Sequence, residues 1–554
     1  MSKITAAYPL APGQAGILFQ SLGDGANGAY VIQIALDIQG TPDLQTERAS
    51  WDALVARHDV LRTAFVWKDR KQPLQVVGSH ARAKLSVIDL GDLDADAQSA
   101  RLDAWLAADR SAGFDLSHAP LLRITRFQRG KDRHRIIVTF HHAILDGWSI
   151  PLLLQDWIAL YSGQTLPTAP AFRDYVAWAQ SQDRTAAQEF WHDHLAGHSH
   201  RVLRLPAPDM PPTSPRGDLS AALTHDETRA LTASLLPLGL TMATAVQGAW
   251  ALLLARATGE DDVIYGLARS VRPVSLTSAD RRVGMYLNTL PMRARIPAQT
   301  PLHLWLADLQ AATYAQVRHE ASTLADALGG HAQHGLNTAV VFENYPRDPA
   351  LLGRLDDFSV RHIEVFEQTS LDLTLFAVHE NGLVLRLLFD ARTTDAGFAK
   401  GLLQDLRHIL CKMGDTPAML VGDIAIASRV PLAAIPARHP PSPNGPALPE
   451  VAAIWRALLE LPAVSGTDNF FDLGGDSLLT LSLQDRIRVA LGVEVEIPDL
   501  FRHATLSAQS AHVQRLFDNA TPALPPRSNN TGHRTRLHHR RALLKAKEPT
   551  QNAQ

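Results

Sequence analysis

Residues 141–147 read HHAILDG and follow directly on an apolar run, IIVTF, at positions 136–140. The β-branched and aromatic residues of that run predict a buried strand, and the Asp-Gly pair predicts a turn after it. The strand therefore delivers two histidines to a turn that also carries a carboxylate. A histidine placed in this way fits a site for acyl transfer, in which a proton must leave the attacking group.

The two histidines cannot have the same role. His141 and His142 are adjacent, so on a strand their rings lie on opposite faces, and only one can face a cleft while the other packs. Read alone, the pair also fits a buried histidine that bonds a backbone carbonyl beside a structural turn. Asp146 either orients His142, as the carboxylate of a catalytic triad does, or forms a structural ion pair. Gly147 allows the turn backbone conformations that other residues resist.

No serine or cysteine in the sequence is marked as a nucleophile for a covalent step. The single cysteine, Cys411, lies in an apolar, helix-like segment, which fits packing better than catalysis. Direct transfer between two bound substrates is therefore favoured over a covalent acyl-enzyme.

The composition is that of an ordinary globular protein, with 554 residues, 46% hydrophobic and 20% charged, and a net charge of −3. This charge gives no general case for binding nucleic acid or a membrane. One cysteine excludes an internal disulfide and a zinc site built on cysteine pairs. The first residues lack the apolar core of a signal peptide, and the densest apolar run, 249–255, is too short to span a bilayer. We therefore expect a cytoplasmic protein with no nucleic-acid partner, no membrane partner and no metal.

Seven prolines between positions 431 and 449 mark the clearest boundary in the chain. Proline fixes φ and removes a backbone donor, so residues 431–448 are expected to form an extended, semi-rigid linker. The residues before it are long enough for two lobes, expected at 1–180 and 181–430. A small unit at 449–517 and a basic, disordered tail at 518–554 follow.

The large body is predicted to be mixed α/β. Strand-like runs occupy 30–38, 121–126, 136–140 and 383–389, and helix-like stretches occupy 49–58, 99–108 and 243–257. The small unit is predicted to be all helix, with helices over 449–461 and from 477 to about 490, a helical turn at 498–501 and a last helix capped by Thr505. Gly492 marks the end of the second of these helices.

Ser477 lies in the stretch LGGDSL, at the predicted start of a helix. A phosphodiester attached there would meet unpaired N–H groups and the positive end of the helix dipole. The two glycines before it let the active site of another protein approach the backbone. A plain N-cap serine is the alternative, but a small helical unit behind a proline-rich linker favours an attachment site.

The order of several motifs points to one family. The motifs are YPLAPGQAGILF at 8–19, RHDVLRTAF at 57–65, HHAILDGWS at 141–149, Asp174-Tyr175 with Trp178, VGMYLNTLP at 283–291 and VFENYP at 341–346. In this order they resemble a nonribosomal peptide synthetase condensation domain. With the carrier-like serine after them, the chain up to about residue 517 resembles a condensation domain followed by a peptidyl carrier (thiolation) domain.

The resemblance implies an α/β fold of two chloramphenicol-acetyltransferase-like lobes that meet in a V around a tunnel, plus a small all-α four-helix carrier domain. It implies condensation, in which an acceptor amine attacks a donor acyl or peptidyl thioester and forms an amide bond. His142 corresponds to the catalytic histidine, with His141 beside it in the family's histidine pair, and Gly147 would lie beside the reacting centre. Asp146 is implied to be mainly structural, with Arg62 as its ion-pair partner.

The resemblance also implies a cofactor and partners. Ser477 corresponds to the residue that carries 4′-phosphopantetheine, which a separate phosphopantetheinyl transferase adds. No adenylation domain lies between the two units, so an adenylation domain acting in trans would load the carrier, and an upstream carrier protein would bring the donor. The stretch HEASTL at 319–324 only loosely resembles the family's late His/Glu-Pro-Leu motif, which leaves details of the second-lobe cleft open.

Other functions remain open at the level of the sequence. The chain could be an ester- or polyamine-acylating condensation enzyme, and only the released product distinguishes these from amide formation. It could also be a non-catalytic platform that only presents Ser477. An epimerisation domain shares the histidine motif but normally follows its carrier. Within condensation domains, residues 145–152, LDGWSIPL, favour the subtype that takes a D-configured donor.

Overall fold

The computed structural model describes residues 3–22, 28, 30–67, 70, 72–198, 203, 205–206, 208, 216–329, 336–343, 357–369, 371–379, 382–416, 418–424, 448–459, 461–470, 473, 477–496, 499–500 and 503–519. The chain divides into two compact units, Met1–Pro436 and Ala437–Gln554. Each unit has a hydrophobic core of its own. The division falls within the predicted linker, 431–448. All of that linker but its last residue, and the predicted tail from residue 520 on, lie outside the described residues.

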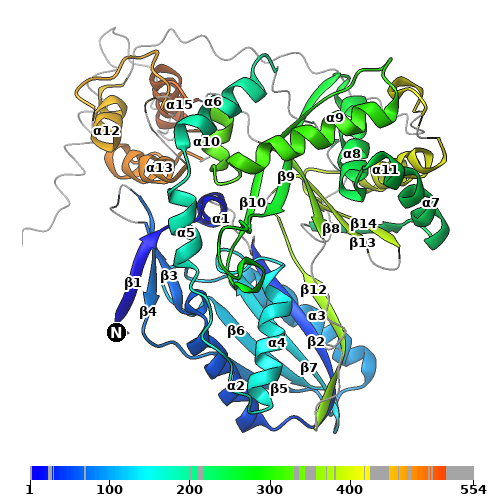
Figure 1. Ribbon diagram of the computed structural model, residues 1–554. Coiled ribbons are helices and arrows are strands. Elements are labelled where there is room, and N and C mark those ends of the chain that lie inside the picture. The colour runs from blue at the N-terminus through cyan, green and yellow to red at the C-terminus, as the bar shows by residue number, and fades with distance from the viewer. Residues whose placement is uncertain are drawn as a thin grey trace, which may run out of the picture. The chain divides into compact units, whose positions relative to one another are not determined.

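A five-stranded sheet forms the centre of the first lobe (Figure 1). Its strands, in order across the sheet, are β12 (Phe358–Phe366), β2 (Val31–Gly40), β7 (Arg133–His141), β6 (Leu122–Gln128) and β5 (Lys84–Asp89). β7 pairs antiparallel with β2, which places Val31 opposite His141. A three-stranded sheet in the same lobe consists of β1 (Ile4–Pro9), β4 (Leu74–Gly78) and β3 (Thr63–Val66).

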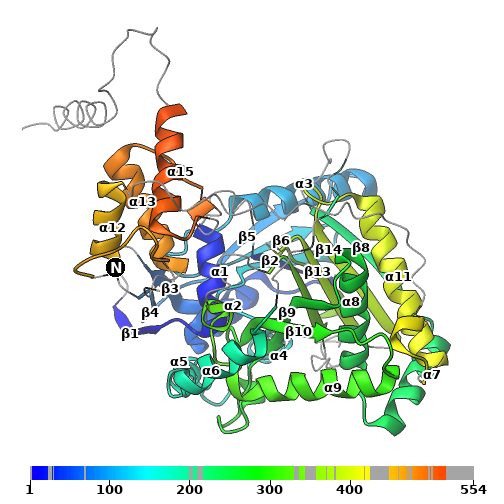
Figure 2. The ribbon, with the colours of Figure 1, turned by 90° about the horizontal axis from the view of Figure 1, so that it is seen from above.

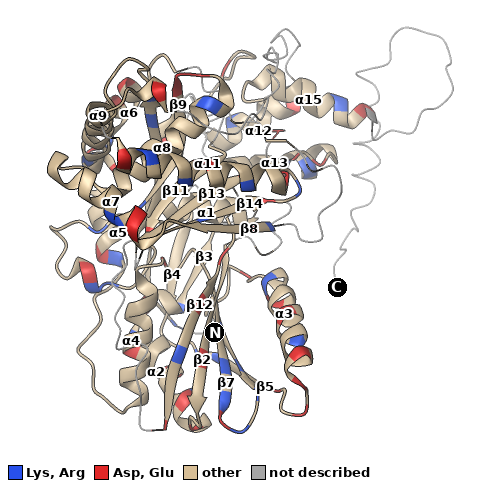
Figure 3. Cartoon of the chain, turned by 90° about the vertical axis from the view of Figure 1, so that its right-hand side faces the viewer, with Lys and Arg blue, Asp and Glu red and all other residues tan. Residues whose placement is uncertain are grey.

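Helices cover both faces of the five-stranded sheet, which explains why β7 reads as an apolar run rather than as an alternation. The helices of this lobe are α1 (Pro12–Leu22), α2 (Leu44–Arg57), α3 (Ala95–Ala112) and α4 (Ser149–Tyr161), with the 3₁₀ turn η1 (Asp59–Arg62) after α2. On one face, Trp51 of α2 stacks on Trp157 of α4 with ring centroids 4.8 Å apart. On the other face, Leu102 and Leu106 of α3 pack against the sheet, and Asp109 of α3 accepts from Gln33 of β2 (2.7 Å). Charged residues of both signs occur along α3 (Figure 3).

The second lobe has a six-stranded mixed sheet with its main core on one face. The strands, in order, are β10 (Leu287–Arg295), β9 (Asp262–Ser270), β11 (Thr338–Glu343), β13 (Leu373–His379), β14 (Leu383–Asp390) and β8 (Arg216–Ala222). The helices of this lobe are α6 (Arg184–Leu195), α7 (His225–Leu235), α8 (Met242–Thr258), α9 (Leu302–Ala315), α10 (Leu324–Leu328) and α11 (Ala396–Asp415). The helix before α6, α5 (Arg173–Gln180), contacts β1 of the first lobe. α8 and α11 lie side by side against the sheet (Figure 2). α8 is buried on nearly all sides.

One strand shows that the lobes are not two consecutive halves of the chain. β12 lies in the range predicted for the second lobe, 181–430, yet it pairs antiparallel with β2 of the first lobe. The expected boundary at 180/181 is therefore too simple, because the second lobe contributes an edge strand to the first. β12 was not among the predicted strands. The strands and helices that were predicted for the large body occur where the periodicity placed them, with ends displaced by a few residues.

The small unit is helical, as the sequence predicts. Its helices are α12 (Pro449–Leu459), α13 (Ser477–Leu491) and α15 (Leu506–Asn519). Trp455 and Phe470 are fully buried in its core. Gly492 takes a positive φ of 64° directly after α13, and the hydroxyl of Thr505 accepts from the backbone N–H of Ala508 (3.3 Å) at the start of α15. The predicted helix end and helix cap are both confirmed.

Neither a membrane-spanning helix nor a metal cluster occurs in the part of the chain that the structure describes. No single helix there is long and apolar enough to cross a membrane, although the consecutive segments His225–Leu238 and Met242–Thr258, bent by 104°, reach that length and composition together. No three His, Cys, Asp or Glu side chains of these residues are grouped so that they could hold a metal ion.

Candidate active site

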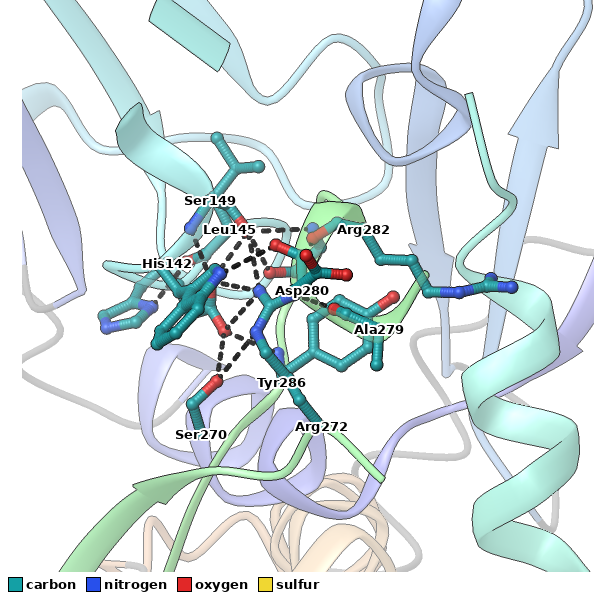
Figure 4. Close-up of polar contacts among 12 residues, drawn as sticks. His142, Leu145, Ser149, Ser270, Arg272, Ala279, Asp280, Arg282 and Tyr286 are labelled. Carbon is teal, nitrogen blue, oxygen red and sulfur yellow. Dashed lines mark hydrogen bonds and ion pairs between the residues drawn. The ribbon is translucent and has the colours of Figure 1, made fainter. Parts of the chain in front are cut away.

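The imidazole of His142, one residue beyond the end of β7, is held by the turn that follows it. The backbone N–H of His142 donates to the carbonyl of Tyr30 (2.8 Å), and Nδ1 lies 2.7 Å from the carbonyl oxygen of Leu145 (Figure 4). Because a carbonyl only accepts, Nδ1 carries the proton and Nε2 presents a lone pair. Burial lowers the pKa of His142 below its ordinary value of 6.5, although the nearby Asp146 acts in the opposite direction. The imidazole is therefore neutral near pH 7 and can accept a proton at Nε2.

His141 is packed and has different partners. Its side chain is buried, and its Nδ1 accepts from the backbone N–H of Ala143 (3.2 Å). Nε2 therefore carries the proton and donates to the hydroxyl of Ser21 (3.1 Å) on α1. Desolvation lowers the pKa of His141 to about 3, and the neighbouring His142 adds to the effect. Of the two histidines, His142 is thus the one placed to meet a substrate.

The buried His141 should make the condensation unit sensitive to acid. In the unfolded chain this group binds a proton near its ordinary pKa of 6.5, but in the folded protein it does so only near 3, so stability rises with pH between these values. Acidification from pH 7 to pH 5 should therefore cost about 2 kcal/mol from this residue alone. Urea unfolding at the two pH values checks this, with His141→Gln as the comparison. An equal loss of stability in the variant would contradict the assignment.

Asp146 connects the histidine turn to the second lobe rather than to the imidazole. Its Oδ1 accepts from the backbone N–H (2.9 Å) and the hydroxyl (2.6 Å) of Ser149. Its Oδ2 accepts from the backbone N–H of Tyr286 (3.2 Å) and the hydroxyl of Ser270 (3.3 Å). Arg272 adds an ion pair at 3.3 Å (Figure 4). Because the hydrogen bonds of this carboxylate go to these groups, Asp146 acts as a brace between the lobes and does not take the place of a triad carboxylate.

The predicted ion pair between Arg62 and Asp146 is not formed. The guanidinium of Arg62 instead donates to the carbonyls of Val55 (2.8 Å), His58 (3.3 Å) and Gly78 (3.1 Å). The first of these lies in the last turn of α2, where carbonyls lack helical donors and the helix dipole favours a cation. These contacts keep Arg62 within the first lobe, and the cation that pairs with Asp146 comes from the second lobe.

Arg272 fastens the loop after β9 to the histidine turn. Its guanidinium lies over the ring of Tyr286, 4.1 Å from the centroid, and 5.4 Å from the centroid of Trp148. It also donates to the carbonyls of Ala279 and Arg282, both at 2.7 Å. One buried guanidinium thus binds the carboxylate of the turn and two carbonyls of the loop (Figure 4) and lies against two aromatic rings.

Two glycines, Gly284 and Gly147, lie at or near the histidine turn. A Cβ on Gly284 would lie 2.3 Å from the ring of Phe172, so only glycine allows this approach. The carbonyl of Gly284 then accepts from the backbone N–H of Asp146 (3.1 Å). Gly147 is not among the described glycines with a positive φ. The turn therefore does not depend on the backbone conformations that only glycine readily adopts at position 147.

The histidine turn is recognisable in the sequence, but the residues that hold it in place are not. Arg272 and Ser270 lie outside the recognised motifs and gave no signal of their own. Tyr286 lies in VGMYLNTLP and Ser149 in HHAILDGWS, so the motifs did point to both stretches. The role of these residues becomes visible only once β9 and the loop after it are seen to lie against the turn.

Ser477 is the first residue of α13, as the sequence predicts. Residues 474–476, which include the two predicted glycines, lie outside the described residues, and so does the side chain of Ser477. The position at the start of a helix in a small helical unit is nevertheless the one expected for a carrier.

The fold and site define the class: a two-lobed α/β protein with a histidine on the turn that joins its lobes, followed by a helical unit. A family model described as "Condensation domain" matches residues 4–434, and one described as "Phosphopantetheine attachment site" matches residues 449–513. The chain belongs to the condensation-domain family, and its relatives belong to nonribosomal peptide synthetases.

Among these relatives, a protein of the linear gramicidin synthase of Brevibacillus parabrevis is 34% identical over 444 residues, which cover 77% of this chain and 6% of the relative. Tyrocidine synthase 2 of the same organism is 28% identical over 420 residues, with 73% and 12% covered. The chain therefore spans only a small part of these relatives.

Solved structures of similar fold cover the same region. The condensation domain from monacolin K polyketide synthase MokA has a TM-score of 0.64 at 19% identity, with 76% of this chain and 100% of that chain covered. A four-domain nonribosomal peptide synthetase bound to AMP and glycine has a TM-score of 0.65 at 18% identity, with 78% and 34% covered. At these identities the likeness shows the fold.

Proposed function

We propose that the chain forms an amide bond between a donor acyl or peptidyl thioester and an acceptor amine, and that Ser477 carries phosphopantetheine. The observation that carries this proposal is the neutral imidazole of His142, whose Nε2 presents a lone pair while Nδ1–H is bound by Leu145. Aminolysis of a thioester needs little beyond orientation and one proton acceptor.

The proposed step balances with this chain's own groups. The amine nitrogen of the acceptor attacks the thioester carbon of the donor, the C–N bond forms, and the C–S bond breaks. His142 Nε2 takes the proton that the amine loses and can return it to the departing thiolate. The carbonyl of Leu145 stabilises the transient imidazolium by accepting from Nδ1–H.

The position of Ser477 supports the attachment of a phosphopantetheine arm. The first turn of α13 has unpaired N–H groups and the positive end of the helix dipole, which favour a phosphodiester. The arm would supply the thiol on which an acyl group is held as a thioester. Tethering the acceptor in this way raises its effective concentration near the condensation unit.

The partners follow from the order of the two matched regions. Only residues 435–448 separate them, which leaves no space for an adenylation domain between them. We therefore propose that an adenylation domain acting in trans loads Ser477, after a phosphopantetheinyl transferase has modified it. A donor carrier protein would bring the acyl or peptidyl group that is transferred.

Replacing Ser477 by alanine should abolish loading of the carrier while leaving both cores intact. Incubation with coenzyme A and a broad-specificity phosphopantetheinyl transferase, followed by intact-protein mass spectrometry, should add one phosphopantetheine to the wild type and none to Ser477→Ala. Ser465→Ala, in the loop before α13, is the matched control and should be modified like the wild type. Modification of Ser477→Ala would exclude Ser477 as the attachment residue.

A further inference from the structure

Tyr30 has an unusual backbone for a bulky residue. Its φ is 61°, in the left-handed region, and among the described non-glycine residues only Ser278 shares a positive φ. This conformation is costly for an aromatic residue and easy for glycine. Such strain persists where the surrounding structure imposes it, and it is typical of functional sites. A tyrosine at a position that suits glycine suggests that the ring itself is needed.

The contacts of Tyr30 converge on His142. The carbonyl of Tyr30 accepts from the backbone N–H of His142 (2.8 Å), one residue beyond the pair that Val31 forms with His141. The Tyr30 ring meets the imidazole of His142 edge to face, with centroids 6.4 Å apart and an interplanar angle of 65°. Its hydroxyl donates to the Oε1 of Gln20 on α1. The residue therefore ties α1, β2 and the histidine together.

We propose that Tyr30 is a positioning residue for His142, and this inference rests on the proposed condensation function. The bond from Nδ1 to Leu145 holds one edge of the imidazole, and the Tyr30 ring limits rotation and hydration on another side. Any residue could supply the backbone carbonyl, but only an aromatic ring supplies the second contact. Tyr30 thus keeps Nε2 directed at the acceptor amine.

Several charged or titratable groups of the described residues lie around this pair. His141 on the same strand is neutral because its pKa is lowered to about 3. Asp146, in the turn after His142, is paired with Arg272 of the second lobe. Arg216, at the start of β8, interacts with Tyr30 and lies 3.7 Å from Asp390. Burial is the largest influence on the pKa of His142 and lowers it. Losing the Tyr30 ring would admit water and let that pKa rise.

Three substitutions test the proposal, because they separate the ring from the backbone. Tyr30→Phe keeps the ring, Tyr30→Ala removes it, and Tyr30→Gly removes it while suiting the left-handed φ. In a single-turnover transfer from an N-acetylglycyl-loaded donor carrier to glycyl-loaded protein, Tyr30→Ala and Tyr30→Gly should lower the rate on the order of tenfold to a hundredfold, as small misplacements do. Tyr30→Phe should retain most of the rate. The dependence on donor-carrier concentration should not change.

Two further readouts distinguish positioning from folding. The acid limb of the pH–rate profile should move to higher pH in Tyr30→Gly, and its unfolding midpoint should be no lower than that of Tyr30→Ala. A wild-type rate in Tyr30→Gly, or an unmoved acid limb, would overturn the proposal. His142→Ala in the same assay tests the function itself. If His142→Ala is slow and Tyr30→Gly is not, only the positioning role fails.

Discussion

Replacing His142 by alanine should slow condensation by about 10²- to 10⁴-fold, which is the usual contribution of a positioned proton acceptor. The residual rate would come from holding two tethered substrates together, which the substitution leaves unchanged. The measurement is the single-turnover rate of acyl transfer between a loaded donor carrier and the loaded chain. The same protein should still accept phosphopantetheine at Ser477 at the wild-type rate, because the carrier has its own core.

A matched control separates the two adjacent histidines. His141→Gln should lose stability, since His141 bonds Ser21 and Ala143 inside the first lobe. It should nevertheless keep a much higher rate than His142→Ala under conditions in which both are folded. If acyl transfer were slow in His141→Gln and fast in His142→Ala, His141 and not His142 would be the proton acceptor.

Replacing Arg272 by methionine should destabilise the condensation unit by about 3–5 kcal/mol, because it leaves the carboxylate of Asp146 buried without its cation. The side chains of the pair are 8% and 1% exposed, so water cannot compensate. The methionine also loses the hydrogen bonds that Arg272 donates to Ala279 and Arg282. Urea unfolding followed by tryptophan fluorescence measures the loss.

Arg62→Met is the matched control for this prediction. Arg62 bonds only backbone carbonyls of its own lobe among the described residues, so its loss should cost about 1–2 kcal/mol. Combining Asp146→Asn with Arg272→Met should recover part of the stability, because no buried charge is then left unpaired. If Arg62→Met lost more stability than Arg272→Met, the result would favour the ion pair between Arg62 and Asp146 that the family resemblance implies.

The sequence predicted those parts of the site whose causes are local. The run at 136–140 leads straight into the histidine pair because β7 ends at His141 and the turn begins at His142. The opposite environments of His141 and His142 follow from the alternation of a strand. The start of α13 at Ser477 and its end before Gly492 likewise depend on capping and on backbone conformation within a few residues.

The parts that escaped prediction depend on contacts between distant segments. Arg272 and Asp146 are 126 positions apart. Nothing in the sequence around Arg272 or around Arg62 shows which of the two arginines pairs with Asp146. β12 pairs with β2 across more than 300 positions, so nothing within either segment shows that the two strands belong to one sheet. The left-handed φ of Tyr30 is imposed by its surroundings, because tyrosine has no intrinsic preference for it.

The central claim is that His142 promotes transfer of an acyl group onto an amine held at Ser477. The most direct measurement mixes a donor carrier bearing N-acetylglycine with the glycyl-loaded chain and locates the acyl group by mass spectrometry of the peptide containing Ser477. We expect N-acetylglycylglycine on that peptide, a free thiol on the donor carrier, and a rate at least about a hundredfold lower in His142→Ala. Equal product in the wild type and His142→Ala would contradict this claim.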